Sequence, residues 1–196
     1  MSKPRVVHFL GELPGIGEDL IHKLVCNNIR CSIVDTWYDF LISKMSTELE
    51  IFSERPILFN PDLVDSNDML LYFALDEQTV DFDALAGIDC DVILLLEGNS
   101  RIDVQVTSLN IIYIHDLISF SEVESIANEK LDELFDLCLS NSRDFDIPSD
   151  KKHWWVSQQD VAACLLRLID YTRPLPQFIH ICGRTGWSNQ YTFEQL

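Results

Sequence analysis

Two apolar runs flank a glycine-containing segment near the start of the chain, and this order constrains the fold more than any other feature. Residues 5–10 and 30–35 have the uniformly apolar pattern of strands buried in a parallel sheet, and residues 17–28 between them have helical periodicity. Gly11 ends the first run, and Gly15 and Gly17 lie at the start of the helix. Asp35 ends the second run. The sequence therefore predicts strand, glycine turn, helix, strand and acid, in that order.

A dinucleotide site requires this order. Glycines let the backbone approach a pyrophosphate, the helix start offers N–H groups and the positive end of its dipole, and the acid binds ribose hydroxyls. The residues predicted to contact the cofactor here are Gly11, Gly15, Ile16 and Gly17, with Asp35 at the ribose. Asp35 would favour NAD over NADP, because its charge repels a 2′-phosphate. The alternative is that Asp35 only ends the strand.

Strands alternate with helices along the rest of the chain. Further strands are predicted at residues 91–96, 109–115 and 178–182, and further helices at 37–46, 121–139 and 158–171. A short apolar run at 57–59 precedes Ser66-Asn67-Asp68, which could cap another helix, and residues 144–152 form a polar loop. This alternation predicts an α/β fold with a doubly wound parallel sheet, Rossmann-like and reduced, as a single domain over residues 1–196.

Composition narrows the class of partner and the compartment. A net charge of −18 disfavours duplex nucleic acid and anionic membranes, and no apolar run approaches the ~20 residues that span a bilayer. The cysteines form no Cys-x-x-Cys pair, so we expect reduced core thiols in a cytoplasmic protein. The histidines are scattered, and no metal site is predicted. The cysteines are Cys26, Cys31, Cys90, Cys138, Cys164 and Cys182.

Several segments resemble the short-chain dehydrogenase/reductase superfamily, and more closely its extended, nucleotide-sugar epimerase/dehydratase branch. Residues 10–17 resemble the family's T-G-x-x-x-G-x-G, and residues 87–93 resemble the start of its fourth strand, with Glu97-Gly98 standing where the family has Ala-Gly. Residues 155–162 resemble its V-H-V-x-D-V-A, and residues 178–196 its closing passage. The resemblance implies a nicotinamide dinucleotide cofactor.

The short segment Asn-Pro-Asp-Leu at residues 60–63 is similar to the family's G-D-L/V element, whose acid contacts adenine. The resemblance therefore implies that Asp62 and Leu63 belong to the cofactor site. Asp62 could instead be a turn former, which is the ordinary role of Asp next to Asn and Pro.

The family's catalytic residues are missing from this sequence. The resemblance requires a Tyr with Lys four residues further on, and none of the five tyrosines has one. Where the family's catalytic Ser follows the fifth strand, residues 112–116 read Ile-Tyr-Ile-His-Asp. The segment 99–110 is too short for the usual fourth helix, and most of the substrate-binding part is absent. No catalytic residue is predicted, although His115 could act as a base at a strand end.

The predicted binding loop also has defects. Pro14 has no N–H to offer a phosphate, and Glu18 and Asp19 follow at the helix start. These acids complement the helix dipole themselves, so they would compete with a bound pyrophosphate. The alternative is that they only pair with the dipole. We therefore expect NAD binding to be weak or absent.

The sequence thus predicts a non-catalytic dinucleotide-fold module that acts in ligand sensing or protein interaction. The alternative is an NAD-dependent nucleotide-sugar epimerase, dehydratase or reductase that needs a further C-terminal part or a partner. A receiver-like domain is disfavoured, because no acid pair follows the first strand. A homodimer or a hetero-partner is expected to contact Ile126, Leu131 or Leu134 of the wide apolar side of 121–139, unless these side chains face the domain's own core.

Overall fold

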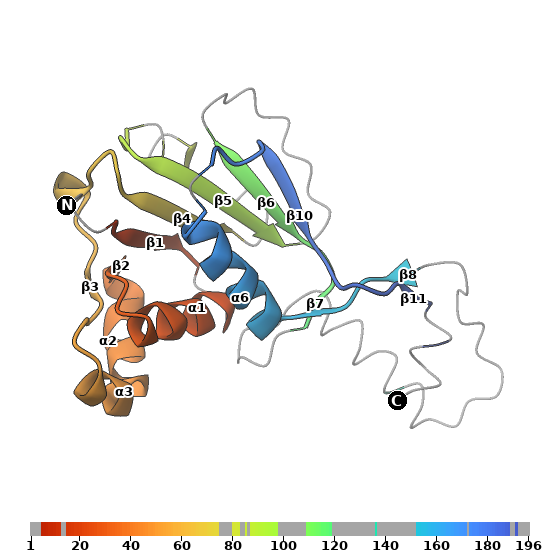
Figure 1. Ribbon diagram of the computed structural model, residues 1–196, viewed down its shortest axis with the longest axis horizontal. Helices are drawn as coiled ribbons and strands as arrows, with labels where there is room; N and C mark the ends of the chain where they lie inside the picture. Colours follow the sequence, from red (N-terminus) through yellow and green to blue (C-terminus); the bar gives the residue numbers. More distant parts are fainter. Residues whose placement is uncertain are drawn as a thin grey trace.

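The computed structural model places a single chain around one main sheet (Figure 1). The residues that the structure describes are 5–12, 15–74, 80–82, 85, 87–97, 109–118, 136, 152–171, 173–188 and 191.

The main sheet has seven strands in the order β10-β6-β5-β4-β1-β2-β3, and every pairing in it is parallel. Its strands are β1 (Val7–Gly11), β2 (Cys31–Ile33), β3 (Ile57–Leu58), β4 (Met69–Ala74), β5 (Asp91–Glu97), β6 (Asn110–Ile114) and β10 (Phe178–Ile181). The strand order reverses between β1 and β4, which is the arrangement of a doubly wound α/β fold. The predicted fold class is confirmed.

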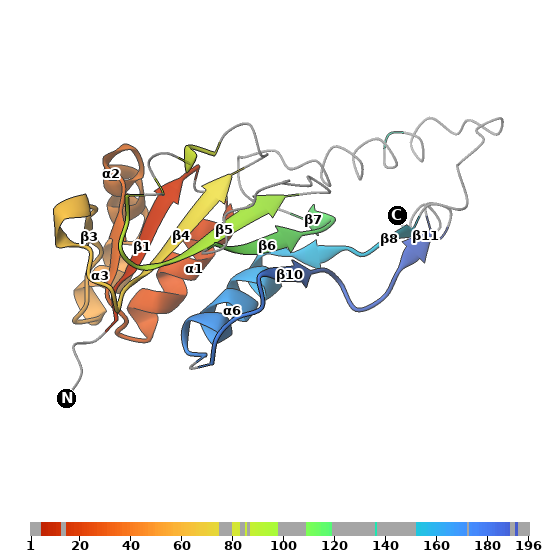
Figure 2. The same cartoon turned by 90° about the horizontal axis from the view of Figure 1, so that it is seen from above.

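Two helices lie side by side on one face of this sheet (Figure 2). They are α1 (Gly15–Cys26) and α6 (Gln158–Ile169). Ser157 caps α6, because its hydroxyl accepts a hydrogen bond from the Asp160 N–H at 3.1 Å. The helices α2 (Asp35–Lys44) and α3 (Ser46–Ile51) and the 3-10 turn η1 (Pro61–Leu63) precede or follow β3.

Two small sheets lie beyond the carboxyl ends of β6 and β10 (Figure 1). In one, β7 (Leu117–Ile118) runs parallel to β9 (Val156–Ser157). In the other, β8 (Lys152–His153) runs antiparallel to β11 (Trp187–Ser188). Among the described residues, no helix is long and apolar enough to cross a lipid bilayer.

The central strands are buried on both faces, which explains their uniformly apolar sequences. On the face covered by α1 and α6, the core includes Phe9, Leu71, Phe73, Leu95 and Ile112. Alternate residues of the same strands form a second cluster on the opposite face, which includes Leu70, Tyr72, Leu94, Ile111 and Tyr113. The predicted strands at 5–10, 91–96, 109–115 and 178–182 and the helices at 17–28 and 158–171 are confirmed to within a few residues.

The prediction of a helix capped by Ser66-Asn67-Asp68 is wrong. These residues lead into β4, which is buried along its whole length between β1 and β5. The Asp68 carboxylate does accept backbone hydrogen bonds, but from the N–H groups of Asp65 and Val6, so it closes a turn before a strand. A helix N-cap and such a turn share the same polar residues, and only pairing with β1 decides between them.

Because β4 is a strand, the segment 87–93 no longer matches the start of the family's fourth strand. The strand that contains residues 91–93 pairs with β4 and β6 rather than with β1, so it is the fifth strand and not the fourth. The strand next to β1 is β4, which ends at Ala74, and not the strand that ends at Glu97. The position after the fifth strand, expected at residues 112–116, follows Glu97 instead and falls on residues 98–108, outside the described residues.

Other predictions fall wholly or mostly outside the described part of the chain. Of residues 121–139 the structure describes only Asp136, and of the predicted loop 144–152 only Lys152, which begins β8.

The cysteines that the structure describes are all free thiols, namely Cys26, Cys31, Cys90, Cys164 and Cys182. Burial raises the pKa of Cys31 to about 12, as expected for an inert core thiol, whereas Cys182 is exposed and does not belong to the core.

Candidate functional site

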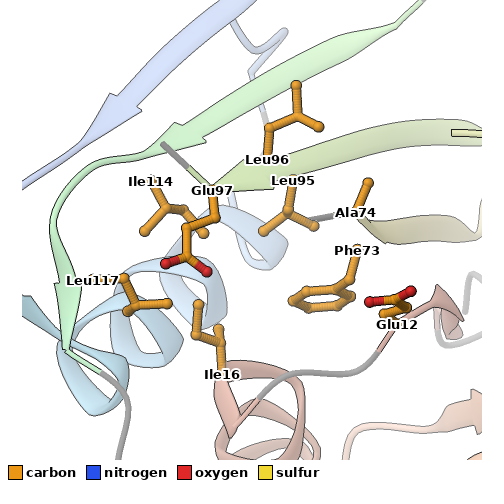
Figure 3. A pocket seen from close by; sticks show the side chains of 9 residues that line it. All are labelled: Glu12, Ile16, Phe73, Ala74, Leu95, Leu96, Glu97, Ile114 and Leu117. Carbon is orange, nitrogen blue, oxygen red and sulfur yellow. The ribbon is translucent and has the colours of Figure 1, made fainter. Parts of the chain in front are cut away.

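A pocket opens at the carboxyl ends of β1, β4, β5 and β6 (Figure 3). It includes the point between β1 and β4 where the strand order reverses, and open α/β sheets bind their ligands there. Its lining residues are Glu12, Ile16, Phe73, Ala74, Leu95, Leu96, Glu97, Ile114 and Leu117. The fold therefore places this pocket where a dinucleotide fold holds its cofactor.

The pocket combines an apolar floor with two carboxylates. Figure 3 shows the Glu12 side chain beside Phe73, and the Glu97 carboxylate between Leu117 and Ile16. None of the nine lining residues is Lys, Arg or His. The empty space of about 280 Å³ includes the part open to solvent, so the enclosed part of the pocket is smaller than this value.

Gly11 has a structural function that is independent of any ligand. Its φ is +80°, in the left-handed region that favours glycine. A Cβ at this position would lie 2.1 Å from the carbonyl oxygen of Phe73. The next residue, Glu12, donates its N–H to that same carbonyl at 3.0 Å. The close approach of β1 to β4 therefore requires glycine here.

Gly15, Ile16 and Gly17 form the buried first turn of α1, which starts at the carboxyl edge of the sheet. Of the predicted cofactor-binding residues, Ile16 is the one that lines the pocket. Of the two acids at the helix start, Glu18 forms an ion pair with Lys44 of α2, so its charge is compensated within the protein. The Oδ2 atom of Asp19 is buried and has no hydrogen-bond partner among the described residues.

Asp35, Asp62 and Leu63 lie along the same edge but outside the pocket lining. Asp35 is the exposed first residue of α2, just after β2, and β2 is the neighbour of β1. Asp62 and Leu63 are exposed in η1, after β3. The Asp62 N–H donates to Oδ1 of Asn60 at 3.0 Å, so Asp62 does belong to a side-chain-capped turn. The adenine contact of Asp62 and Leu63 stays a prediction.

Sequence reasoning did not place Glu12 and Glu97 in the lining of one pocket. Each is an acid at the end of a buried strand, a pattern that can be read from the sequence alone. What the sequence did not show was that the two strand ends face one pocket, because β4 between them was not recognised as a strand.

A buried Ser–His–Asp network lies at the opposite, amino-terminal end of the strands. His8 Nδ1 is 2.7 Å from Ser32 Oγ, and His8 Nε2 is 3.2 Å from Asp68 Oδ2. Burial alone would raise the pKa of Asp68, but hydrogen bonds from the Asp65 and Val6 N–H groups and from His8 bring that pKa below its ordinary value. All three side chains are buried, so a substrate has no access and the network links β1, β2 and β4.

His115, considered as a base, hydrogen-bonds to another histidine and does not line the pocket. Its Nε2 lies 2.8 Å from Nδ1 of His180 on β10. Burial and the neighbouring His180 lower the pKa of His115, and Asp116 opposes them. Asp116 itself is held by His153, whose Nδ1 is 3.0 Å from Oδ1, and by the Trp154 N–H. Among the described residues, no three metal-ligating side chains gather into a site.

The topology and the pocket together define a dinucleotide fold of the Rossmann type. No family model matches the sequence, and no curated protein sequence matches it. Solved structures match its fold. Gre2 from Candida albicans has a TM-score of 0.58 and 12% identity, over 96% of this chain and 80% of Gre2.

Two further structures show the range of these neighbours. A GDP-L-fucose synthetase from Naegleria fowleri has a TM-score of 0.58 and 10% identity, over 99% of this chain and 77% of its own. A Rossmann-fold NAD(P)-binding family protein from Shigella flexneri has a TM-score of 0.54 and 14% identity, over 95% of this chain and 98% of its own. At these identities the likeness establishes the fold.

Proposed function

We propose that this chain is a non-catalytic dinucleotide-fold module, related to NAD-dependent epimerases and dehydratases, that acts in ligand sensing or protein interaction. The observation that carries the proposal is that two acids, Glu12 and Glu97, and no Lys, Arg or His are found among the nine described residues that line the pocket, at the edge where this fold binds a pyrophosphate. Anionic ligands are held by N–H groups and cations, and two carboxylates in their place disfavour them.

The sequence supports the absence of catalysis. No tyrosine has a lysine four residues on, so the acid/base pair that the resemblance requires is missing. A positioned acid or base typically contributes 10²–10⁴-fold to rate, so its loss removes most of such an activity.

The second candidate is an NAD-dependent epimerase, dehydratase or reductase completed by a further part or a partner. It is favoured by structural neighbours solved with cofactors, namely Gre2 from Candida albicans in complex with NADPH and the Naegleria fowleri synthetase bound to NADP. A nicotinamide cofactor would then extend from the first turn of α1 toward Asp35, and Asp62 and Leu63 would take its adenine.

Calorimetric titration of NAD, NADP and ADP-ribose into the purified chain separates the two candidates. We expect no saturable binding by the wild type, and measurable binding by the double variant Glu12→Gln/Glu97→Gln, because it removes both carboxylate charges from the pocket. Glu50→Gln is the matched control, since Glu50 is an exposed acid on α3 outside the pocket lining. Sub-micromolar NAD binding by the wild type would overturn the proposal and favour the enzyme.

A further inference from the structure

The strand β3 forms an edge of the main sheet with large apolar side chains in solvent. It is the last strand in the order and pairs with β2. Its two residues alternate between the faces of the sheet, and both are exposed, Ile57 at 52% and Leu58 at 47%. Leu63, just after it in η1, is 65% exposed. We call these three residues the edge surface, and Figure 1 shows β3 at the end of the sheet opposite β10.

The backbone of β3 offers hydrogen bonds outward. The Phe59 N–H donates to the Ile33 carbonyl at 2.9 Å, so it points inward toward β2. Peptide groups of successive residues in a strand point to opposite sides, so the N–H and C=O of Leu58 point away from the sheet. Proteins protect such edges with short strands, charged residues or proline; β3 is only two residues long and Pro56 precedes it, but neither residue of β3 itself is charged or a proline.

Charge selects the kind of segment that fits this edge. Along the sequence, the exposed acid Glu50 lies on α3 before the edge and the exposed acid Asp62 lies in η1 after it, and the exposed base Arg55 lies two residues before β3. Glu54 is already paired, with Arg30 at 3.4 Å. The whole chain carries −18, so a second copy would be repelled and a basic segment attracted.

We propose that β3 is a docking edge for an extended segment of a partner protein in which apolar and basic residues alternate. The segment adds a strand beside β3, its backbone pairs with Leu58, and its alternate side chains lie over the edge surface or toward the acids. This inference specifies the protein-interaction part of the proposed function and does not depend on whether the pocket binds a nucleotide.

The test uses the whole ¹⁵N-labelled chain and the peptide acetyl-Lys-Val-Lys-Val-Lys-Val-amide. We expect amide shifts confined to residues 51–65 and largest at Leu58, and no shifts with the glutamate counterpart of the peptide. Leu58→Pro removes the outward donor while leaving the Phe59 N–H bond to Ile33 intact, and its predecessor Ile57 is already extended, as proline requires. This variant should bind about tenfold more weakly, the value of roughly one hydrogen bond.

The matched control is Leu58→Ala, which keeps the N–H and should retain more affinity than Leu58→Pro. If the proline variant unfolds, Ile57→Lys replaces it, because an added cation on the same edge should weaken binding of the lysine peptide. Shifts scattered over the acidic surface, or equal binding by Leu58→Pro, would overturn the proposal. So would a wild-type dimer that Leu58→Pro converts to monomer, which would identify β3 as a self-pairing edge. Competition of the peptide with NAD would assign Asp62 and Leu63 to the cofactor instead.

Discussion

A single carboxylate ties together the amino-terminal ends of the central strands. Asp68 is 2% exposed and accepts hydrogen bonds from two backbone N–H groups and from His8, which in turn contacts Ser32. Buried polar groups are expensive when they lose a partner, so this network is a sensitive point of the fold.

We expect Asp68→Asn to lower the free energy of unfolding by about 1–3 kcal/mol at pH 7, because the amide cannot accept all of these hydrogen bonds. The pKa of Asp68 is lowered in the folded chain. Its charge therefore stabilises the fold above the ordinary carboxyl pKa, and this contribution is lost as pH falls through the folded value. Urea denaturation at pH 7 and at pH 3 should show a smaller difference between wild type and variant at pH 3. An equal difference at both values would contradict this account.

The His115–His180 pair gives a second pH dependence. Burial and His180 lower the pKa of His115, so the unfolded chain takes up its proton at higher pH than the folded chain. Stability should therefore fall as pH drops from 7 through the range where histidine titrates. His115→Phe should flatten this part of the pH profile, measured by thermal unfolding between pH 7 and pH 5, and an unchanged slope would count against it.

Among the elements, the adjoining strands β1 and β4 are the point at which the strand order of the main sheet reverses. Most strands and helices were predictable from local pattern, since an apolar run bounded by turn residues, or a helical stripe, is visible in the chain itself. The strand β4 was not, because Ser66-Asn67-Asp68 is equally compatible with a helix cap, and only its non-local pairing with β1 and β5 resolves this. The glycine loop and Ile16 of the candidate site were also predictable from the local sequence pattern. That Glu12 and Glu97 line the same pocket was not, because it depends on the order of the strands in the sheet.

Gly11→Ala should lower the free energy of unfolding by about 2 kcal/mol or more, since a Cβ would collide with the Phe73 carbonyl and the backbone is left-handed. Gly87→Ala is the matched control, because an added Cβ there meets nothing within 4 Å. Chemical denaturation of the two variants gives the comparison. Equal stability of the two would show that β1 and β4 can separate without cost.

At the scale of the whole molecule, a dinucleotide fold carries a strong negative charge and an acidic pocket. The scaffold alone does not set the function, which depends on the residues at its ligand edge. The expected association through Ile126, Leu131 or Leu134 lies outside the described residues and stays a prediction. Light scattering on Leu131→Glu would test it, with unfolding of the variant pointing to a core position instead.

The purified chain should show no cofactor-dependent turnover with NAD and a panel of nucleotide sugars, because no Tyr–Lys pair is available as the acid/base. Conversion above the blank that Tyr113→Phe abolishes would identify an active enzyme. Tyr113 is buried in β6 and does not line the pocket, so conversion that survives this substitution would come from another residue of the chain or from a contaminating enzyme.

The contact between Gly11 and Phe73 bears on what a glycine-rich sequence motif indicates about a protein. A residue that is required by strand packing is not free to vary whether or not a ligand binds, because any side chain at that position would disrupt the sheet. The first glycine of such a fingerprint therefore indicates the fold, whereas the residues that line the pocket indicate what the fold can bind. In this chain the two kinds of position are neighbours, since Gly11 lies against the Phe73 backbone and Glu12 lines the pocket.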